Sequence, residues 1–518
     1  MGRCLGLKNE WHHRRAMLNG GVFSRGVAKE QRIAGPPQGL CDAPALVFAR
    51  IICVIGAALL LSFSTPVHAQ QSPPADPPQE EQSAGSSEQA PAIPADAQKK
   101  EERSTGLPKK VKWTFSFDAA WGSFGFANSL YTNSRPDPSG DLGDHWFEGS
   151  IKPALSASFA LGKSELYGKV SGVGERTYGP PPSVVGESAS SFMQEDLYVG
   201  WRSGKSLSGT ENLLDFTVGR TQYTIGHGFL VWDGGGEGGS RGGFWSNARK
   251  AWQFAAIGRL SPKNQKIEGF YLDRDELPEA ETGSRLAGVN YEYAVGENST
   301  FGLSYIKAFA HNDVLPDRDG MNVFNARAYT APFPKLPDLS FELEYAHEKN
   351  GDIQNSRAWS ALGAYELSRV AWKPKFSYRY SFYDGNDLNT SENEAFDPLF
   401  LGFYDWGTWW QGEIAGEYFL SNANNISHQA RIHMSPTDAL GLGVMAYWFR
   451  LPQPASFGSG ATSSNVAFEF DSYADWKINK NFTLSLVGAF ADPHEAAEQA
   501  YGRTKNFFYG MVYIAYSY

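Results

Sequence analysis

Paired carboxylates are the residues of this chain whose spacing could do chemistry. Glu342 and Glu344 stand two positions apart, as do Glu469 and Asp471. Two such groups on one strand face could act as acid and base, although in strands they more often pair with Arg or Lys of a neighbour. The chain has no His-Glu-x-x-His motif, which argues against zinc proteases. We therefore predict no enzyme, no metal site and no cofactor.

Other charged residues alternate with apolar residues at period two, which places them on the polar face of strands. If the strands close into a barrel in a membrane, that face lines a water-filled lumen. Two interpretations stay open: a lattice of ion pairs that stiffens the wall, or a charged constriction that attracts solutes of one sign. The candidate lumen residues are Lys152, Lys169, Arg202, Arg220, Arg327, Lys375, Arg379, Arg431, Glu469 and Asp471, together with Glu148, Glu175, Asp196, Asp215, Glu292, Glu342 and Glu344.

A glycine-rich segment follows one of the predicted strands. Residues 219–249 include seven glycines between Gly234 and Gly243. Such a loop could fold into the lumen as a constriction that carries Glu237, Arg241 and Arg249, or it could remain a flexible surface loop. The sequence leaves both possibilities open.

The elements that must position these residues are long alternating strands. Apolar residues fill every second position of 147–161, 339–346 and 376–382, and charged or small polar residues fill many of the others. In the same way Val466, Phe468 and Phe470 should face away from Glu469 and Asp471. Several runs reach ten residues or more, whereas strands of soluble proteins are usually ~5–6 residues and membrane strands ~9–11. Length therefore favours a transmembrane barrel.

Connections and the last strand support the same fold. Short polar turns at 162–164, 261–264, 296–299, 435–438 and 478–481 alternate with longer loops, as in outer-membrane barrels. Residues 507–518 form an amphipathic strand with a terminal aromatic residue. We predict an all-β protein with a single antiparallel barrel of about 18 strands, an even number because both ends should lie in the periplasm. This count assigns 385–422, including the ambiguous run 409–420, to one loop; 16 strands is the fallback.

Composition is compatible with this fold. Aromatic residues make up 14% of the chain and there are 55 Gly, yet the mean hydropathy is −0.39. Barrels combine one apolar face, one polar face and aromatic girdles, although a large soluble all-β protein would share much of this composition. The net charge of −10 argues against a nucleic-acid partner.

The N-terminal part predicts export from the cytoplasm. Arg50, the apolar run 51–64 and a small-residue end at Ala69 resemble a secretory signal peptide. We expect three regions: 1–69 as N-terminal extension and signal peptide, 70–109 as a disordered periplasmic linker rich in Pro, Gln, Glu, Ala and Ser, and 110–518 as the barrel. The late position of the signal suggests a downstream translation start. Cys4, Cys41 and Cys53 all precede the cleavage point, so the mature chain would contain no cysteine.

Three stretches carry a family resemblance. Residues 215–228 (DFTVGRTQYTIGHG), Phe396-Asp-Pro-Leu-Phe, and Phe468-Glu-Phe-Asp with the later Asp492-Pro493 resemble the alginate export porins over roughly 190–518. The resemblance implies an 18-stranded barrel that passes an anionic polyuronate, with basic residues in the lumen. It places Arg220 there, whereas the local alternation aligns Arg220 with Phe216 and Val218; a bulge near Gly219 would reconcile the two.

We therefore expect an outer-membrane channel for passive transport of a polar, anionic saccharide such as alginate. Its partners would be outer-membrane lipid, the saccharide and periplasmic export components. A substrate-specific uptake porin for small polar solutes remains an alternative, as does a structural or adhesive barrel with no open pore.

Overall fold

The computed structural model describes residues 111–518, apart from 130–143, 180, 182–187, 208, 233, 237, 403–410, 421, 459 and 503–504. The predicted signal peptide, the linker, the three cysteines and Glu237 lie outside the described residues. The division of the chain at residues 69 and 109 therefore stays a prediction.

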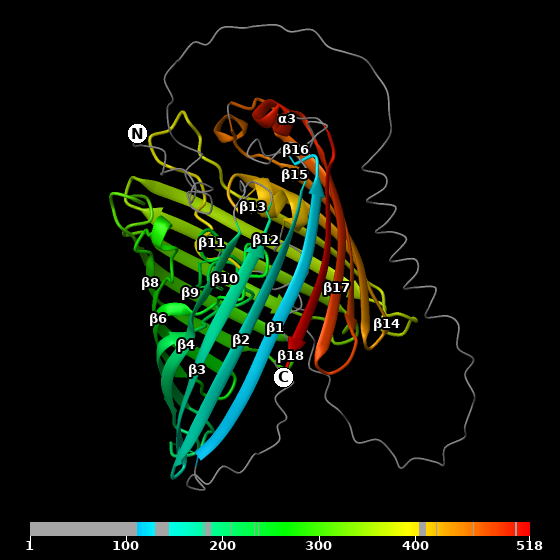
Figure 1. Ribbon diagram of the computed structural model, residues 1–518. Helices are drawn as coiled ribbons and strands as arrows, with labels where there is room; N and C mark the ends of the chain where they lie inside the picture. Colours follow the sequence, from blue (N-terminus) through cyan, green and yellow to red (C-terminus); the bar gives the residue numbers. More distant parts are fainter. Residues whose placement is uncertain are drawn as a thin grey trace, which may run out of the picture. The chain divides into compact units, whose positions relative to one another are not determined.

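The described chain forms one closed ring of 18 antiparallel strands, which confirms the predicted all-β barrel and its strand number (Figure 1). Each strand pairs with its neighbours in sequence, and β1 closes the ring by pairing with β18. Closure leaves no sheet edge exposed to the membrane. Such an edge would be costly, because backbone N–H and C=O groups find no hydrogen-bond partner in lipid. No described helix is long and apolar enough to cross a membrane.

The first nine strands are β1 (Val111–Ala127), β2 (Asp144–Leu161), β3 (Ser164–Tyr178), β4 (Ala189–Arg202), β5 (Leu214–Thr221), β6 (Trp252–Leu260), β7 (Gln265–Asp273), β8 (Arg285–Ala294) and β9 (Ser299–Phe309). The other nine are β10 (Asn322–Thr330), β11 (Leu339–Asn350), β12 (Gln354–Glu366), β13 (Lys375–Tyr383), β14 (Asn425–Thr437), β15 (Leu440–Arg450), β16 (Asn465–Lys477), β17 (Phe482–Pro493) and β18 (Phe507–Ser517). The helical pieces are η2 (Pro278–Ala280), the π-helix η3 (Gly412–Phe419), η4 (Pro454–Ser456) and α3 (Glu495–Tyr501).

The two strand faces separate as the alternation predicted. In β13, Phe376 and Tyr378 are 45% and 50% exposed on the outer face. The next residue, Arg379, faces the interior and is 1% exposed. Val466 is an exception. We expected it on the outer face with Phe468, but it is fully buried in an interior cluster. The prediction is wrong because the register of β15 and β16 shifts next to Arg450, which breaks the alternation before Ala467.

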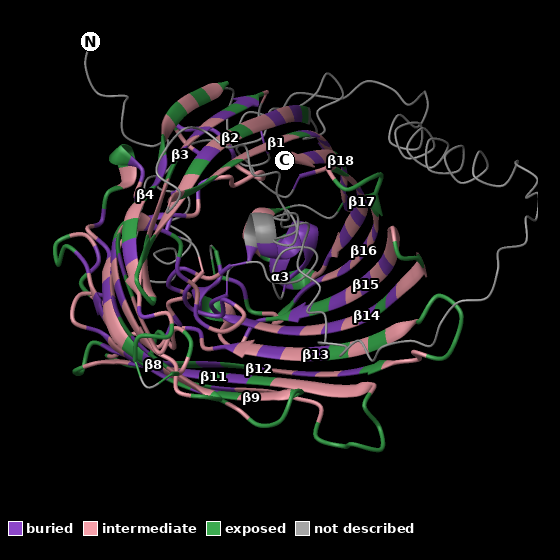
Figure 2. Cartoon of the chain, turned by 90° about the horizontal axis from the view of Figure 1, so that it is seen from below, coloured by how far each residue is buried: buried purple, intermediate pink, exposed green. Residues whose placement is uncertain are grey.

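Connections differ in length at the two ends of the barrel. The turns near the C-terminus are short, and the opposite end carries the long loops 222–251 and 384–424 (Figure 1). Both loops contribute to the interior. One buried cluster joins loop residues such as Phe229 and Phe400 to wall residues of β6–β13. Viewed along the ring, Figure 2 shows buried segments and α3 within the outline of the strands.

Candidate solute pathway

A belt of ion pairs runs around the interior wall from β3 to β10. Lys169 meets Asp196 at 2.9 Å, and Arg259 meets Glu268 at 3.0 Å. Farther along, Glu292 accepts both Lys266 at 2.8 Å and Arg327 at 2.7 Å. Side chains such as Lys169 (25% exposed) and Lys266 (38%) remain open to the interior. The belt is charged but nearly balanced, as in a wall lattice of salt bridges.

A bulge explains one member of this wall that the alternation did not reveal. The β3–β4 register shifts between Val170 and Gly172. As a result the consecutive residues Glu195 and Asp196 are both buried on the interior side. We predicted Asp196 there but not Glu195, because strict alternation allows only one of two neighbours to face the lumen. No local sequence pattern predicts this bulge.

Three wall glutamates hold the glycine-rich loop in the lumen. Glu148 of β2 accepts the backbone N–H groups of Trp245 and Ser246 at 3.0 and 2.8 Å. Glu195 of β4 accepts those of Lys250 and Ala251 at 2.7 and 3.1 Å and also binds Lys152 at 3.1 Å.

Between them, Glu175 of β3 accepts the N–H of Ala248 at 2.9 Å. Hydrogen bonds to charged groups are worth about 1.5–3 kcal/mol each. Segment 245–251 is therefore bound to three adjacent strands, and the structure favours an inward loop over a free surface loop.

The same loop brings together three arginines that the sequence had singled out. Arg220, Arg241 and Arg249 all bind the carboxylate of Asp275, Arg241 at 3.2 Å. Arg241 also donates to the carbonyl oxygens of Gly236 at 3.0 Å and Glu276 at 2.7 Å. Asp275 was not among the candidates, because it lies in a short loop after β7 with no pattern around it.

The arginine cluster consists of Arg220, Arg241 and Arg249 around the one carboxylate of Asp275. The next acidic groups are Glu175, which acts on Arg249, and Glu279, which acts on Arg241. Within the described part of the chain, four buried guanidinium nitrogens of the cluster find no hydrogen-bond partner: the Nε atoms of all three arginines and Nη1 of Arg249. Burial lowers the pKa of Arg241, and the neighbouring arginines act in the same direction against Asp275. Unpartnered guanidinium donors favour a carboxylate or another oxyanion.

A bulge at Gly219 places Arg220 on the interior side. The β5–β6 register shifts between Gly219 and Thr221. Gly219 has a φ of +126°, and a Cβ there would lie 2.8 Å from the Cα of Tyr198 and still closer to the Leu197 carbonyl oxygen. Only glycine adopts this backbone without strain. The expected bulge is therefore present, and it reconciles Arg220 with the alternation.

The second long loop meets the first across the lumen. Trp232 N–H donates to the Phe400 carbonyl at 2.8 Å, and Phe400 N–H donates to the Leu230 carbonyl at 2.9 Å, so the two loops form a short parallel bridge. Arg318 anchors this loop through two hydrogen bonds of 2.6 Å to Asp397. Burial alone would lower the pKa of Arg318, but Asp397 more than offsets it and raises that pKa.

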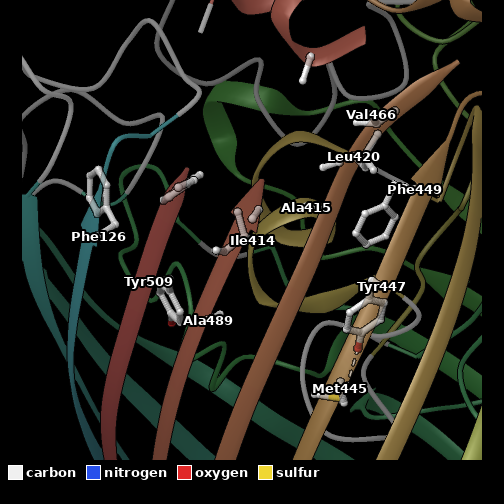
Figure 3. Packing of buried hydrophobic residues seen from close by; sticks show 14 of the residues in the cluster. Phe126, Ile414, Ala415, Leu420, Met445, Tyr447, Phe449, Val466, Ala489 and Tyr509 are labelled. Carbon is white, nitrogen blue, oxygen red and sulfur yellow. Dashed lines mark hydrogen bonds between the residues drawn. The ribbon is translucent and has the colours of Figure 1, made fainter. Parts of the chain in front are cut away.

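Glu469 and Asp471 hold the far end of this loop. Glu469 accepts the N–H groups of Ile414 and Ala415 at 2.8 and 2.7 Å, and Asp471 accepts that of Glu413 at 3.2 Å. Figure 3 shows Ile414 and Ala415 packed among wall residues, including Tyr447 and Tyr509. Glu469 and Asp471 thus face the interior as expected, but they lie fully buried beneath a loop.

The remaining predicted lumen residues are spread along the wall. Arg379 and Arg431 are buried on β13 and β14, and Arg431 donates to the Tyr473 hydroxyl at 3.1 Å. Arg202 binds Glu165 at 2.6 Å near the turn end of β4, and Lys375 begins β13 half-buried. The sequence thus found the interior face. The structure adds that the arginine cluster forms only when loop 222–251 folds inward.

In the described residues, no group of three or more His, Cys, Asp or Glu is arranged to hold a metal ion.

The closed ring, the apolar exterior and the polar interior define a bacterial outer-membrane β-barrel channel. The family model described as alginate export matches residues 316–510. The predicted resemblance to the alginate export porins is thereby confirmed over those residues, which include the Phe396 and Phe468 motifs; residues 215–228 precede them.

Solved structures share the fold at low sequence identity. A BenF-like porin from Pseudomonas fluorescens Pf-5 has 13% identity and a TM-score of 0.51, over 78% of this chain and 98% of that chain. The outer membrane protein opdK from Pseudomonas aeruginosa has 10% identity and a TM-score of 0.50 over the same shares. Among curated protein sequences, none matches significantly.

Proposed function

We propose that this channel passes an anionic polysaccharide of the polyuronate type, such as alginate, across the outer membrane along its concentration gradient. The observation that carries the proposal is the arginine cluster, where three guanidinium groups share the single carboxylate of Asp275. A uronate presents one carboxylate per sugar ring, and guanidinium groups bind carboxylates in a bidentate geometry. The family match over 316–510 supports the same substrate class.

The ion-paired belt complements this cluster. Because the lysines and arginines of the belt are paired with acidic residues, the belt should bind a passing polyanion only weakly. Weak binding suits conduction, since the solute must also be released. Strong attraction would then be confined to the arginine cluster. The hydroxyl-bearing and carboxylate side chains of the wall can exchange hydrogen bonds with sugar hydroxyls as the chain moves.

Planar-bilayer recording tests the proposal. Oligouronates should block the current of the purified full chain, and neutral oligosaccharides of equal length should not. The double substitution Arg220→Gln with Arg241→Gln should weaken that block by about tenfold or more, because each charged hydrogen bond is worth about 1.5–3 kcal/mol. Lys205→Gln, on an exposed turn with 68% of its side chain accessible, is the matched control.

Three results would overturn the proposal. Equal block by neutral sugars would favour the uptake porin for small polar solutes, and the absence of any conductance would favour a structural barrel. Oligouronate block that survives the double substitution unchanged would remove the arginine cluster from the pathway.

A further inference from the structure

A groove crosses the outer, lipid-facing wall of β12–β16. The strand register aligns Gly363, Tyr378, Ala430, Ala446 and Phe470 directly opposite one another on consecutive strands. Three of these residues have side chains no larger than a methyl group, so the outer surface is hollowed along this row. The hollow has a volume of about 610 Å³. We call it the β12–β16 groove.

The walls of the groove are apolar. Tyr365, Phe376 and Tyr378 are 40%, 45% and 50% exposed beside it, and Ile432 and Val444 line its end nearest the periplasmic turns. An elongated apolar hollow between aromatic rings on a membrane-facing surface suits a lipid acyl chain, because it restores the contacts that small side chains leave open.

Basic residues cluster beside the periplasmic end of the groove. The neighbouring turns 331–338 and 367–374 carry exposed Lys335, Arg369 and Lys373. The two turns are fixed to one another, since the Ser368 hydroxyl donates to Asp338 at 2.7 Å. Asp338 and Glu366 are the acidic groups of this edge, and both are only partly exposed. Of the described periplasmic turns, no other adjacent pair gathers as many basic side chains.

The turn after β12 lies over the groove end. Ser435 N–H of β14 donates to the Trp372 carbonyl at 2.7 Å. Ile432, which lines the groove, is three residues from Ser435 on the same strand, a span of about 10 Å. A lysine or arginine side chain on this turn can therefore reach a headgroup whose acyl chain occupies the groove.

The same turn and its neighbour expose large apolar side chains. Trp372 is 55% exposed and Val370 50%, and in the adjoining turn Phe333 and Leu336 are 49% and 48% exposed. Trp372 and Lys373 have φ values of +67° and +42°, a left-handed backbone that is rare for residues with bulky side chains. Strained residues persist where the surroundings hold them, often at binding sites. Aromatic and basic residues together are typical of the membrane–water interface.

We propose that the β12–β16 groove and its two basic turns bind one phospholipid with a net negative headgroup, such as a phosphatidylglycerol, from the periplasmic leaflet. One acyl chain lies along Gly363, Ala430 and Ala446. The phosphate meets Arg369 and Lys373. Basic pockets at helix or strand ends bind anionic headgroups by the same attraction.

Native mass spectrometry of the full chain tests this site. The protein is equilibrated in nanodiscs with equal parts phosphatidylglycerol and phosphatidylethanolamine, and the lipids retained after release are counted. The natural sequence should retain phosphatidylglycerol preferentially. Arg369→Gln with Lys373→Gln should weaken that retention by about tenfold or more, because each basic residue near the surface is worth about 1 kcal/mol. Lys477→Gln with Lys480→Gln, at another periplasmic turn, is the control.

A groove-filling variant separates the acyl-chain site from charge alone. Ala446→Leu should reduce retention of the lipid, whereas Ala326→Leu, on the lipid-facing side of β10, should not. Added inorganic phosphate should fail to displace the lipid, because it supplies no chain for the groove. Equal retention of both lipids, or retention unchanged by both the double substitution and Ala446→Leu, would overturn the proposal.

Discussion

The carboxylate of Glu469 on β16 accepts the backbone N–H of Ile414 at 2.8 Å, and so ties the far end of loop 384–424 to the wall two strands beyond β14. The neighbouring N–H of Ala415 is bound to the second oxygen at 2.7 Å. Glu469, together with Asp471 at the N–H of Glu413, therefore holds η3 against the wall.

Replacing Glu469 by Gln should release this loop more often. The lost charge-assisted hydrogen bonds are worth about 1.5–3 kcal/mol, which raises the population of the released loop by about tenfold or more. Single-channel recordings should show more frequent transitions and a larger mean conductance. Glu165→Gln, near the turn end of β3, serves as the control, and identical traces for all three proteins would contradict the role assigned to Glu469.

Phe400 should act as the central contact of the loop bridge. Its ring lies 5.3 Å from that of Trp252 and 4.5 Å from the guanidinium carbon of Arg274. Phe400→Ala removes a buried aromatic ring, a change that typically costs about 3–5 kcal/mol, so the bridge should open and conductance should rise. Phe324→Ala, on the lipid-facing surface of β10 and outside the β12–β16 groove, is the matched control. A conductance equal to that of the natural sequence would mean that the bridge does not limit the pathway.

Arg327 should set both stability and ion preference. It bonds Glu292 at 2.7 Å, Ser304 at 2.9 Å and Asn325 at 3.0 Å, with its side chain fully buried. Arg327→Gln removes one of the two cations that Glu292 binds and leaves Lys266 as its remaining partner. Each lost charged hydrogen bond is worth about 1.5–3 kcal/mol. The thermal unfolding temperature in detergent should fall, and the reversal potential in a salt gradient should shift toward cations. Arg202→Gln, which breaks a more exposed pair, should give a smaller fall in stability.

Gly219 offers a test of the bulge that orients Arg220. Gly219→Ala places a methyl group against the Leu197–Tyr198 backbone at a positive φ, at a cost on the order of 1–3 kcal/mol. We expect lower thermal stability and weaker oligouronate block together. Gly269→Ala in β7, where a Cβ would meet nothing within 4 Å, is the control. If both variants unfold at the same temperature, the bulge is not strained as described.

The sequence predicts the closed barrel and the residues on its inner face, but not the contacts that the loops make inside the lumen. Alternation in stretches such as 376–382 identifies lipid and lumen sides because one face must be apolar. The alternation fails at Val466 and Glu195, because a register shift at each place inserts an extra residue into one strand and reverses which neighbours face inward. Asp275 and the partners of Glu469 could not be predicted, because loop backbones are bound to residues more than twenty positions away and no local periodicity encodes such contacts.

The seam between β1 and β18 has a consequence for the rate at which the native state forms. Ser517 donates to Asp118 across this seam although 399 positions separate them in the chain. Every other strand pair joins neighbours in sequence, whose loop-closure entropy is small. Assembly can thus proceed hairpin by hairpin as a curved sheet, and the β1–β18 pairing, which joins residues almost 400 positions apart, forms last and slowest.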